Sequence, residues 1–184
     1  MLDGVVPSPP EFAARYREKG YWEDRSMASV FDETFAKNAD RIAVVTEAQC
    51  ITYHELGQRV ERLALNLLKL GVNPLDRVVV QLPSVPEFLY LYFALQKVGA
   101  IPLTALPPHR YVEVSYFVSH TEAVGYAIPD QMGDFDFLEL ARRLRKENPS
   151  LQHVFVYGED MPSGFISLTG LVRRDSGISP DALH

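Results

Sequence analysis

The sequence predicts a layered α/β fold with a mainly parallel sheet and flanking helices. Short apolar runs alternate with segments of helical periodicity from residue 41 to residue 158. The run 78–80 (Val-Val-Val) is apolar without alternation, as in a parallel strand that is covered on both faces. Strand and helix alternating at this spacing indicate right-handed crossovers within one parallel sheet.

The chain divides into three predicted segments around this alternation. Residues 1–40 hold a Pro-rich extended stretch and helices, residues 41–158 form the α/β core, and residues 159–184 form a linker or tail. The length of 184 residues suits one domain, and 47% hydrophobic with 23% charged residues is typical of globular proteins.

The first half of the chain offers clear element boundaries. Residues 11–19 can form a short helix that ends at Gly20, and Ser26 is a candidate N-cap for a helix over 26–37. Two β-rich runs around a polar turn predict a hairpin, and Thr52 with Glu55 form a capping box for the helix that follows. That helix has one apolar face at a 3.6-residue period, formed by Leu56, Val60, Leu63, Leu67 and Leu70.

The second half continues the alternation. Ser84 and Glu87 have the spacing of a second capping box, which predicts a nearly all-apolar helix over 85–98 after a strand over 76–82. Residues 111–122 fit both strand and helix patterns, and the rhythm of crossovers favours a helix. The remaining predictions are strands over 100–106, 123–128 and 153–157, a helix over 135–147, and a short helix over 167–173 before a loose tail.

Composition excludes several function classes. A net charge of −6 disfavours nucleic-acid binding, because phosphate backbones attract clustered Lys and Arg. The one short basic cluster, Arg142, Arg143, Arg145 and Lys146, fits the solvent-facing side of a helix. No apolar stretch is long enough to span a membrane and no signal peptide is recognised, so a cytoplasmic location is expected. The single cysteine, Cys50, is interpreted as a strand residue.

Few residues are candidates for chemistry. His109 and Arg110 follow a strand at the expected carboxyl edge of the sheet, where open α/β folds bind ligands. Arg110 could therefore meet a phosphate or a pantetheine group, or it could pair with Glu113 and anchor a turn. His54-Glu55 lacks the second histidine of a zinc motif, and no metal site is predicted.

Several motifs in register resemble the adenylate-forming enzymes, which include acyl-CoA synthetases, peptide-synthetase adenylation domains and luciferases. ITYHEL (51–56) and FALQKVGAIPLTALP (93–107) are similar to the first two core motifs of that superfamily. PEFAARYREKGYW (10–22), RVVVQLPSVPEF (77–88) and ALPPHR (105–110) narrow the resemblance to aryl-acid–AMP ligases of siderophore assembly, which act on 2,3-dihydroxybenzoate or salicylate. The resemblance implies that the fold is the first part of the large N-terminal domain of such an enzyme.

The resemblance also implies a reaction for the parent protein. An aryl carboxylate attacks the α-phosphate of Mg²⁺–ATP, and the aryl group then passes from the adenylate to the pantetheine thiol of a carrier protein. The phosphate loop and the aryl-acid pocket of the family lie beyond the matched region. Residues 167–174 (SLTGLVRR) resemble that loop only weakly. No catalytic residue and no cofactor is therefore assigned to this chain, whereas the parent would use ATP and Mg²⁺.

Two hypotheses follow for the chain itself. It is an inactive N-terminal fragment of an aryl-acid–AMP ligase, or it is a binding module or split-enzyme half that joins a second polypeptide. Its expected partners are the remainder of the enzyme, an aryl carrier protein or a second copy of the chain.

Overall fold

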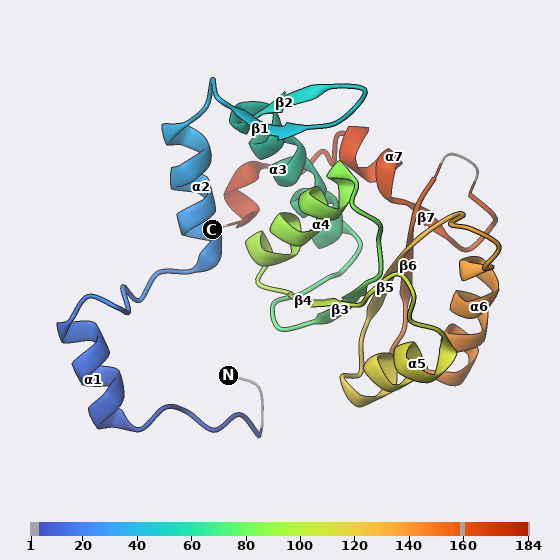
Figure 1. The fold of residues 1–184 in the computed structure, drawn as a ribbon, viewed down its shortest axis with the longest axis horizontal. Coiled ribbons are helices and arrows are strands. Elements are labelled where there is room, and N and C mark those ends of the chain that lie inside the picture. The colour runs from blue at the N-terminus through green and yellow to red at the C-terminus, as the bar shows by residue number, and fades with distance from the viewer. Residues whose placement is uncertain (1–3, 159–160, 184) are drawn as a thin grey trace.

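The central feature is a five-stranded, fully parallel sheet of order β4-β3-β5-β6-β7. A computed structural model describes residues 4–158 and 161–183 (Figure 1). The strands of this sheet are β3 (Arg77–Val80), β4 (Ile101–Thr104), β5 (Gly125–Pro129), β6 (His153–Tyr157) and β7 (Ile166–Ser167). The predicted α/β fold class is thus confirmed.

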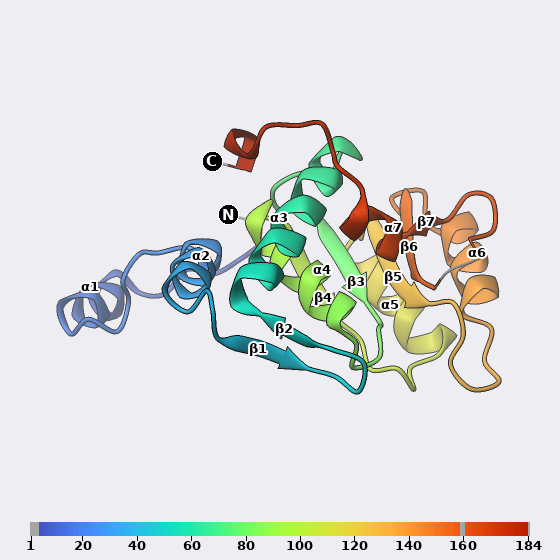
Figure 2. The same ribbon diagram turned by 90° about the horizontal axis from the view of Figure 1, so that it is seen from above.

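Helices cover both faces of this sheet, as Figure 2 shows from above. One face packs against α3 (Tyr53–Lys69), α4 (Pro86–Lys97) and α7 (Leu168–Arg173), and the other against α5 (Tyr111–His120) and α6 (Phe137–Glu147). Side chains alternate along each strand, so β3 sends Val78 and Val80 to the first face and Val79 to the second. This two-sided burial explains the unbroken apolar run in the sequence.

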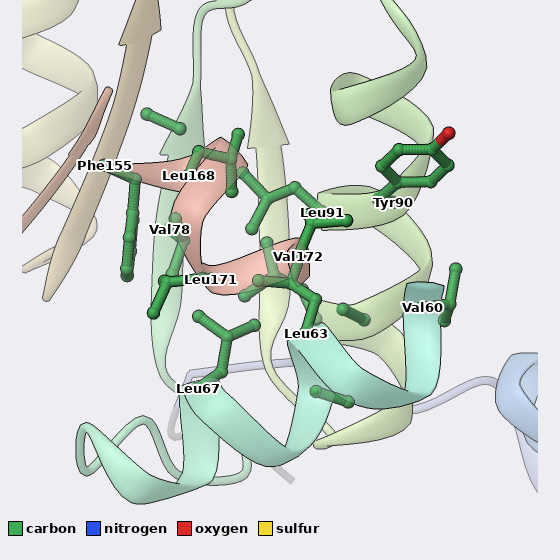
Figure 3. Close-up of a cluster of buried hydrophobic side chains, with 14 of the residues drawn as sticks. Val60, Leu63, Leu67, Val78, Tyr90, Leu91, Phe155, Leu168, Leu171 and Val172 are labelled. Carbon is green, nitrogen blue, oxygen red and sulfur yellow. The ribbon is translucent and has the colours of Figure 1, made fainter. Parts of the chain in front are cut away.

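The larger core lies between the sheet and the α3–α4–α7 face. Figure 3 shows leucines of α3 and α4 meeting side chains of β3, β6 and α7. The labelled residues with no exposed surface at all are Leu63, Leu67, Val78, Leu91, Phe155 and Leu168. The predicted apolar face of the helix after residue 52 is the side of α3 that enters this core.

A hairpin of β1 (Ile42–Val45) and β2 (Cys50–Thr52) leads into α3, as predicted. The Thr52 hydroxyl accepts a hydrogen bond from the Glu55 N–H at 3.2 Å, and the Glu55 carboxylate accepts one from the Thr52 N–H at 2.9 Å. The donated Thr52 N–H lowers the pKa of Glu55, because it stabilises the charged carboxylate. The predicted capping box is therefore confirmed.

Replacing Thr52 by alanine removes the side-chain acceptor at the start of α3. We expect the free energy of unfolding to fall by about 1 kcal/mol, the usual contribution of an N-cap side chain. Urea unfolding at neutral pH measures this loss, and Thr52→Ser is the matched control because serine keeps the hydroxyl. An unchanged midpoint for the alanine variant would contradict this role of the cap.

The first helices precede the hairpin. They are α1 (Pro10–Glu18) and α2 (Met27–Lys37). The Ser26 hydroxyl accepts a hydrogen bond from the Ser29 N–H at 3.1 Å, which confirms the predicted N-cap of α2. Aromatic contacts hold α2 against α4, because the ring centroids of Phe31 and Phe93 lie 4.5 Å apart.

The predicted capping box at Ser84 is wrong. The N-cap of α4 is Val85, whose side chain makes no capping bond, and Pro86 occupies the first turn. Proline suits that position because its missing N–H would have no partner inside the helix. The ambiguous stretch after residue 110 is a helix, α5, as favoured.

Residues 166–173, which the sequence places in the tail segment, belong to the folded body. They form β7, which pairs with β6, and α7, which confirms the predicted short helix. The buried Asn66 amide of α3 donates to the carbonyls of Leu171 at 3.0 Å and Arg174 at 2.9 Å. These bonds hold the chain against α3 until it reaches a short 3₁₀ helix, η1 (Pro180–Leu183).

The two edges of the sheet offer little to a further strand. At one edge, the N–H groups of Ile101 and Ala105 donate inward to carbonyls of the β3 side. Pro102 occupies the alternate, outward position and has no N–H to donate. At the other edge, β7 has only two residues. Short edges and edge prolines limit pairing with another chain.

Candidate functional site

The carboxyl ends of the parallel strands meet at one edge of the sheet, where open α/β folds bind ligands. Gln81 follows β3, the segment 105–110 follows β4, and Asp130 follows β5. The structure brings the first two of these into direct contact. This edge is therefore the candidate functional site within the described residues.

Gln81 organises the loop after β4. Its side chain is fully buried, and the amide nitrogen lies 2.9 Å from the carbonyl oxygens of Leu106 and His109 and 3.3 Å from that of Pro107. Its amide oxygen accepts a hydrogen bond from the Tyr126 hydroxyl. Burial raises the pKa of Tyr126, so the phenol keeps the proton that it donates.

Arg110, the predicted ligand residue, folds back onto this same loop. Its guanidinium donates to the carbonyls of Pro107 and His109, both at 2.9 Å, and lies 4.1 Å from the centroid of the Phe135 ring. Arg110 is exposed at the surface. These contacts fix the guanidinium in place, and a role in ligand binding stays a prediction.

The alternative predicted for Arg110, a pairing with Glu113 that anchors a turn, is made by the backbone of Arg110. The backbone N–H of Arg110, rather than its guanidinium, donates to the Glu113 carboxylate at 3.0 Å. This donated N–H lowers the pKa of Glu113. Glu113 thereby anchors the turn at the start of α5.

His109 is held by two neighbours. Its Nδ1 accepts a hydrogen bond from the Leu106 N–H at 3.2 Å, and its ring lies 5.5 Å from that of Phe117. An accepting Nδ1 places the proton of the neutral ring on Nε2. His109 can therefore offer an N–H donor from a fixed loop.

Gly158 and Asp130 approach each other closely at the ends of β6 and β5. A Cβ built on Gly158, after β6, would lie 2.1 Å from a carboxylate oxygen of Asp130. The other Asp130 oxygen accepts from the Gln131 N–H at 2.7 Å. Glycine at position 158 thus leaves room for the Asp130 side chain between the ends of β5 and β6.

The remaining predicted residues have structural contacts. Cys50 lies in β2 at the surface. Of the basic cluster, Arg143 pairs with Glu147 at 3.0 Å along α6. These contacts fit the structural interpretation of each residue.

The segment resembling a phosphate loop is part of the core. The Ser167 hydroxyl accepts from the Gly170 N–H at 2.9 Å and caps α7. Leu168, Leu171 and Val172 of that helix are buried against α3 and α4. Its hydroxyl and backbone groups therefore serve the fold.

Residues 4–158 and 161–183 contain neither a metal-ligand cluster nor a membrane-spanning helix. No group of three or more His, Cys, Asp or Glu residues in this part is placed to hold a metal ion, and we assign none of them to Mg²⁺. No helix of this part is long and apolar enough to cross a membrane.

Comparison with known proteins identifies the family. The family described as "AMP-binding enzyme" matches residues 31–173. Triostin synthetase I of Streptomyces triostinicus is 47% identical over 159 residues, which cover 86% of this chain and 29% of that protein. The 2,3-dihydroxybenzoate-AMP ligase of Bacillus subtilis is 42% identical, over 86% of this chain and 30% of its own length.

Two mycobacterial proteins match nearly the whole chain. A salicyl-AMP ligase / salicyl-S-ArCP synthetase of Mycobacterium tuberculosis is 38% identical, over 97% of this chain and 32% of that protein. The apo structure of Mycobacterium smegmatis MbtA superposes with a TM-score of 0.84 at 35% identity, over 98% of this chain and 34% of MbtA. The chain thus spans about a third of the length of these proteins. It belongs to the AMP-binding family of adenylate-forming enzymes and corresponds to their N-terminal part.

Proposed function

We propose that this chain is the N-terminal part of an aryl-acid–AMP ligase of a siderophore-type pathway. The parent enzyme would join a 2,3-dihydroxybenzoate or salicylate carboxylate to the α-phosphate of ATP and release pyrophosphate. The pantetheine thiol of a carrier protein would then attack the acyl carbon and release AMP. The identity of 42% to a 2,3-dihydroxybenzoate-AMP ligase carries this proposal, and the identity of 38% to a salicyl-AMP ligase supports it.

By itself the chain is proposed to be inactive. Adenylate formation needs N–H groups and cations that surround the phosphates. At the candidate site, the Gln81 amide and the Arg110 guanidinium are already bonded to carbonyls of their own loop. Residues 167–174, the segment that resembles a phosphate loop, are packed in the core. The chain would need no cofactor of its own and would act in the cytoplasm.

We expect no pyrophosphate release when the purified chain is given Mg²⁺–ATP with salicylate or 2,3-dihydroxybenzoate. Isothermal titration with Mg²⁺–ATP, and then with a non-hydrolysable aryl-adenylate analogue, should give no saturable heat. Pyrophosphate release would contradict the proposed inactivity, and micromolar binding would contradict the expectation that the chain has no phosphate-binding site of its own. Arg110→Ala would then be the first variant to test, because Arg110 is an exposed cation that follows β4 at this edge of the sheet.

A second candidate function is that of a split-enzyme half or a binding module. The two cores and the helices on both faces of the sheet favour a unit that folds without help. The DNA downstream discriminates between the candidates. A separate reading frame that begins with the phosphate loop favours a split enzyme, and a continuous frame favours a fragment of a longer chain.

A further inference from the structure

The segment of residues 4–26, which we call the arm, stands apart from the rest of the molecule. It includes α1 and leads into α2, and Figures 1 and 2 both show α1 projecting away from the sheet and its helices. No residue of the arm is buried. An isolated helix of this length is marginal in water, so packing elsewhere is needed to hold it.

The arm nevertheless has an organised shape of its own. Gly20 takes a left-handed φ of 71° and ends α1, after which the N–H of Tyr21 donates to the carbonyl of Tyr16 at 2.8 Å. This turn brings the Tyr16 ring within 5.4 Å of the Trp22 ring. Arg17 lies 5.7 Å over the Trp22 ring and donates to the Asp24 carboxylate at 2.7 Å. The local bonds therefore present a defined cluster of aromatic rings.

This cluster has the composition of a binding surface. The exposed fractions are 41% for Phe12, 69% for Tyr21 and 39% for Trp22. Aromatic rings contribute most to stability and binding when they are buried. Trp, Tyr and Arg are the residues that dominate the binding energy of interfaces. Next to the rings, a hollow of about 530 Å³ opens between the arm and the start of α2. A partner side chain has room to enter there.

The comparisons indicate which partner covers this surface. The match to MbtA leaves 2% of this chain outside, a share smaller than the arm, so the match includes arm residues. The same match covers only 34% of MbtA. MbtA therefore shares the arm, and the part of MbtA outside the match is about twice as long as the matched part. That outer part is the partner that we expect to cover the exposed rings of the arm.

We propose that the arm is a docking element for the remaining two thirds of the adenylate-forming polypeptide, with Trp22 and Tyr21 as its anchors. The proposal rests on the proposed function, because it takes the chain to be the first third of such a ligase. The exposed rings then become buried only when that polypeptide is present. The arm would hold that polypeptide against the sheet and its helices.

A chimera tests the proposal, with this chain in place of the matching first third of the M. tuberculosis salicyl-AMP ligase. Amide hydrogen exchange of peptides from the arm is compared between the free chain and the chimera. We expect exchange slower by on the order of tenfold or more in the chimera. Equal exchange in a folded chimera would overturn the proposal.

Variants separate docking from a local role. Trp22→Ala is expected to lower the melting temperature of the chimera by several degrees and to leave that of the free chain unchanged, whereas Trp22→Phe should retain most of the chimera's stability. An equal effect of Trp22→Ala on both proteins would overturn docking. A free chain that sediments as a dimer with a protected arm would show that a second copy is the occupant instead.

The outcomes also distinguish this proposal from the proposed function. A chimera that fails to fold would count against both, since the chain could not then replace the first third of the ligase. A folded, active chimera whose arm exchanges freely would contradict only the docking role.

Discussion

Replacement of Phe155 by alanine is expected to lower the free energy of unfolding by about 3–5 kcal/mol, the range for removing a buried aromatic side chain. Phe155 lies on β6 with no exposed surface, inside the larger core. Its ring covers Gly125 of β5, where an added Cβ would lie 3.2 Å from the ring edge. The missing Cβ at position 125 thus leaves the space that this ring fills.

Urea unfolding followed by circular dichroism measures this loss. Phe155→Leu should cost less than alanine, because leucine refills part of the cavity. Val112→Ala is the matched control, since Val112 is 75% exposed on α5 and its truncation should change stability by less than about 0.5 kcal/mol. Similar losses for Phe155→Ala and Val112→Ala would contradict the assigned core.

Replacement of Gln81 by alanine should destabilise the chain by about 2 kcal/mol, because the buried Tyr126 hydroxyl would lose its acceptor and the loop after β4 would lose the amide that bonds it. The substitution leaves the Tyr126 hydroxyl without its acceptor. It also removes the donor that Gln81 supplies to the carbonyls of Leu106 and His109, which keep their bonds from the His109 N–H and the Arg110 guanidinium. The loop over residues 105–110 should also become mobile. The effect is thus expected both on stability and on the order of the candidate site.

Amide hydrogen exchange across residues 105–113 and urea unfolding measure the two effects. Tyr126→Phe is the informative companion, because it removes one bond and leaves the amide bonds to the loop in place. It should reduce stability by about 1 kcal/mol, the net contribution of a single hydrogen bond. Unchanged exchange of the loop in Gln81→Ala would contradict the role assigned to Gln81.

The sequence predicted those elements that local signals define. The capping box at Thr52 and the apolar face of α3 both follow from spacing within one helix, and both are confirmed. The strand over 153–157 is also confirmed, because two-sided burial leaves an unbroken apolar run.

Other features depend on distant parts of the chain. The two residues of β7 form a strand only because β6 lies beside them. The capping role predicted for Ser84 failed because Pro86 suits the first turn of α4, which places Val85 at the cap.

The organisation of the candidate site could be predicted only in part. The sequence places Arg110 at the carboxyl edge of the sheet, where it lies, but it does not reveal Gln81 as the residue that organises the loop. The available signal was one amide within the apolar run 78–82. A polar residue at the end of a buried strand must find partners, and the sequence does not reveal that these are carbonyls from more than twenty residues away.

The most direct test of the account is pyrophosphate release by the chimera with the M. tuberculosis salicyl-AMP ligase, measured with Mg²⁺–ATP and salicylate. The free chain serves as the parallel sample. The account predicts salicylate-dependent release by the chimera and none by the free chain, because this chain would supply the first third of the fold and the ligase would supply the phosphate loop and the aryl-acid pocket. A folded chimera without activity, or release by the free chain, would contradict it.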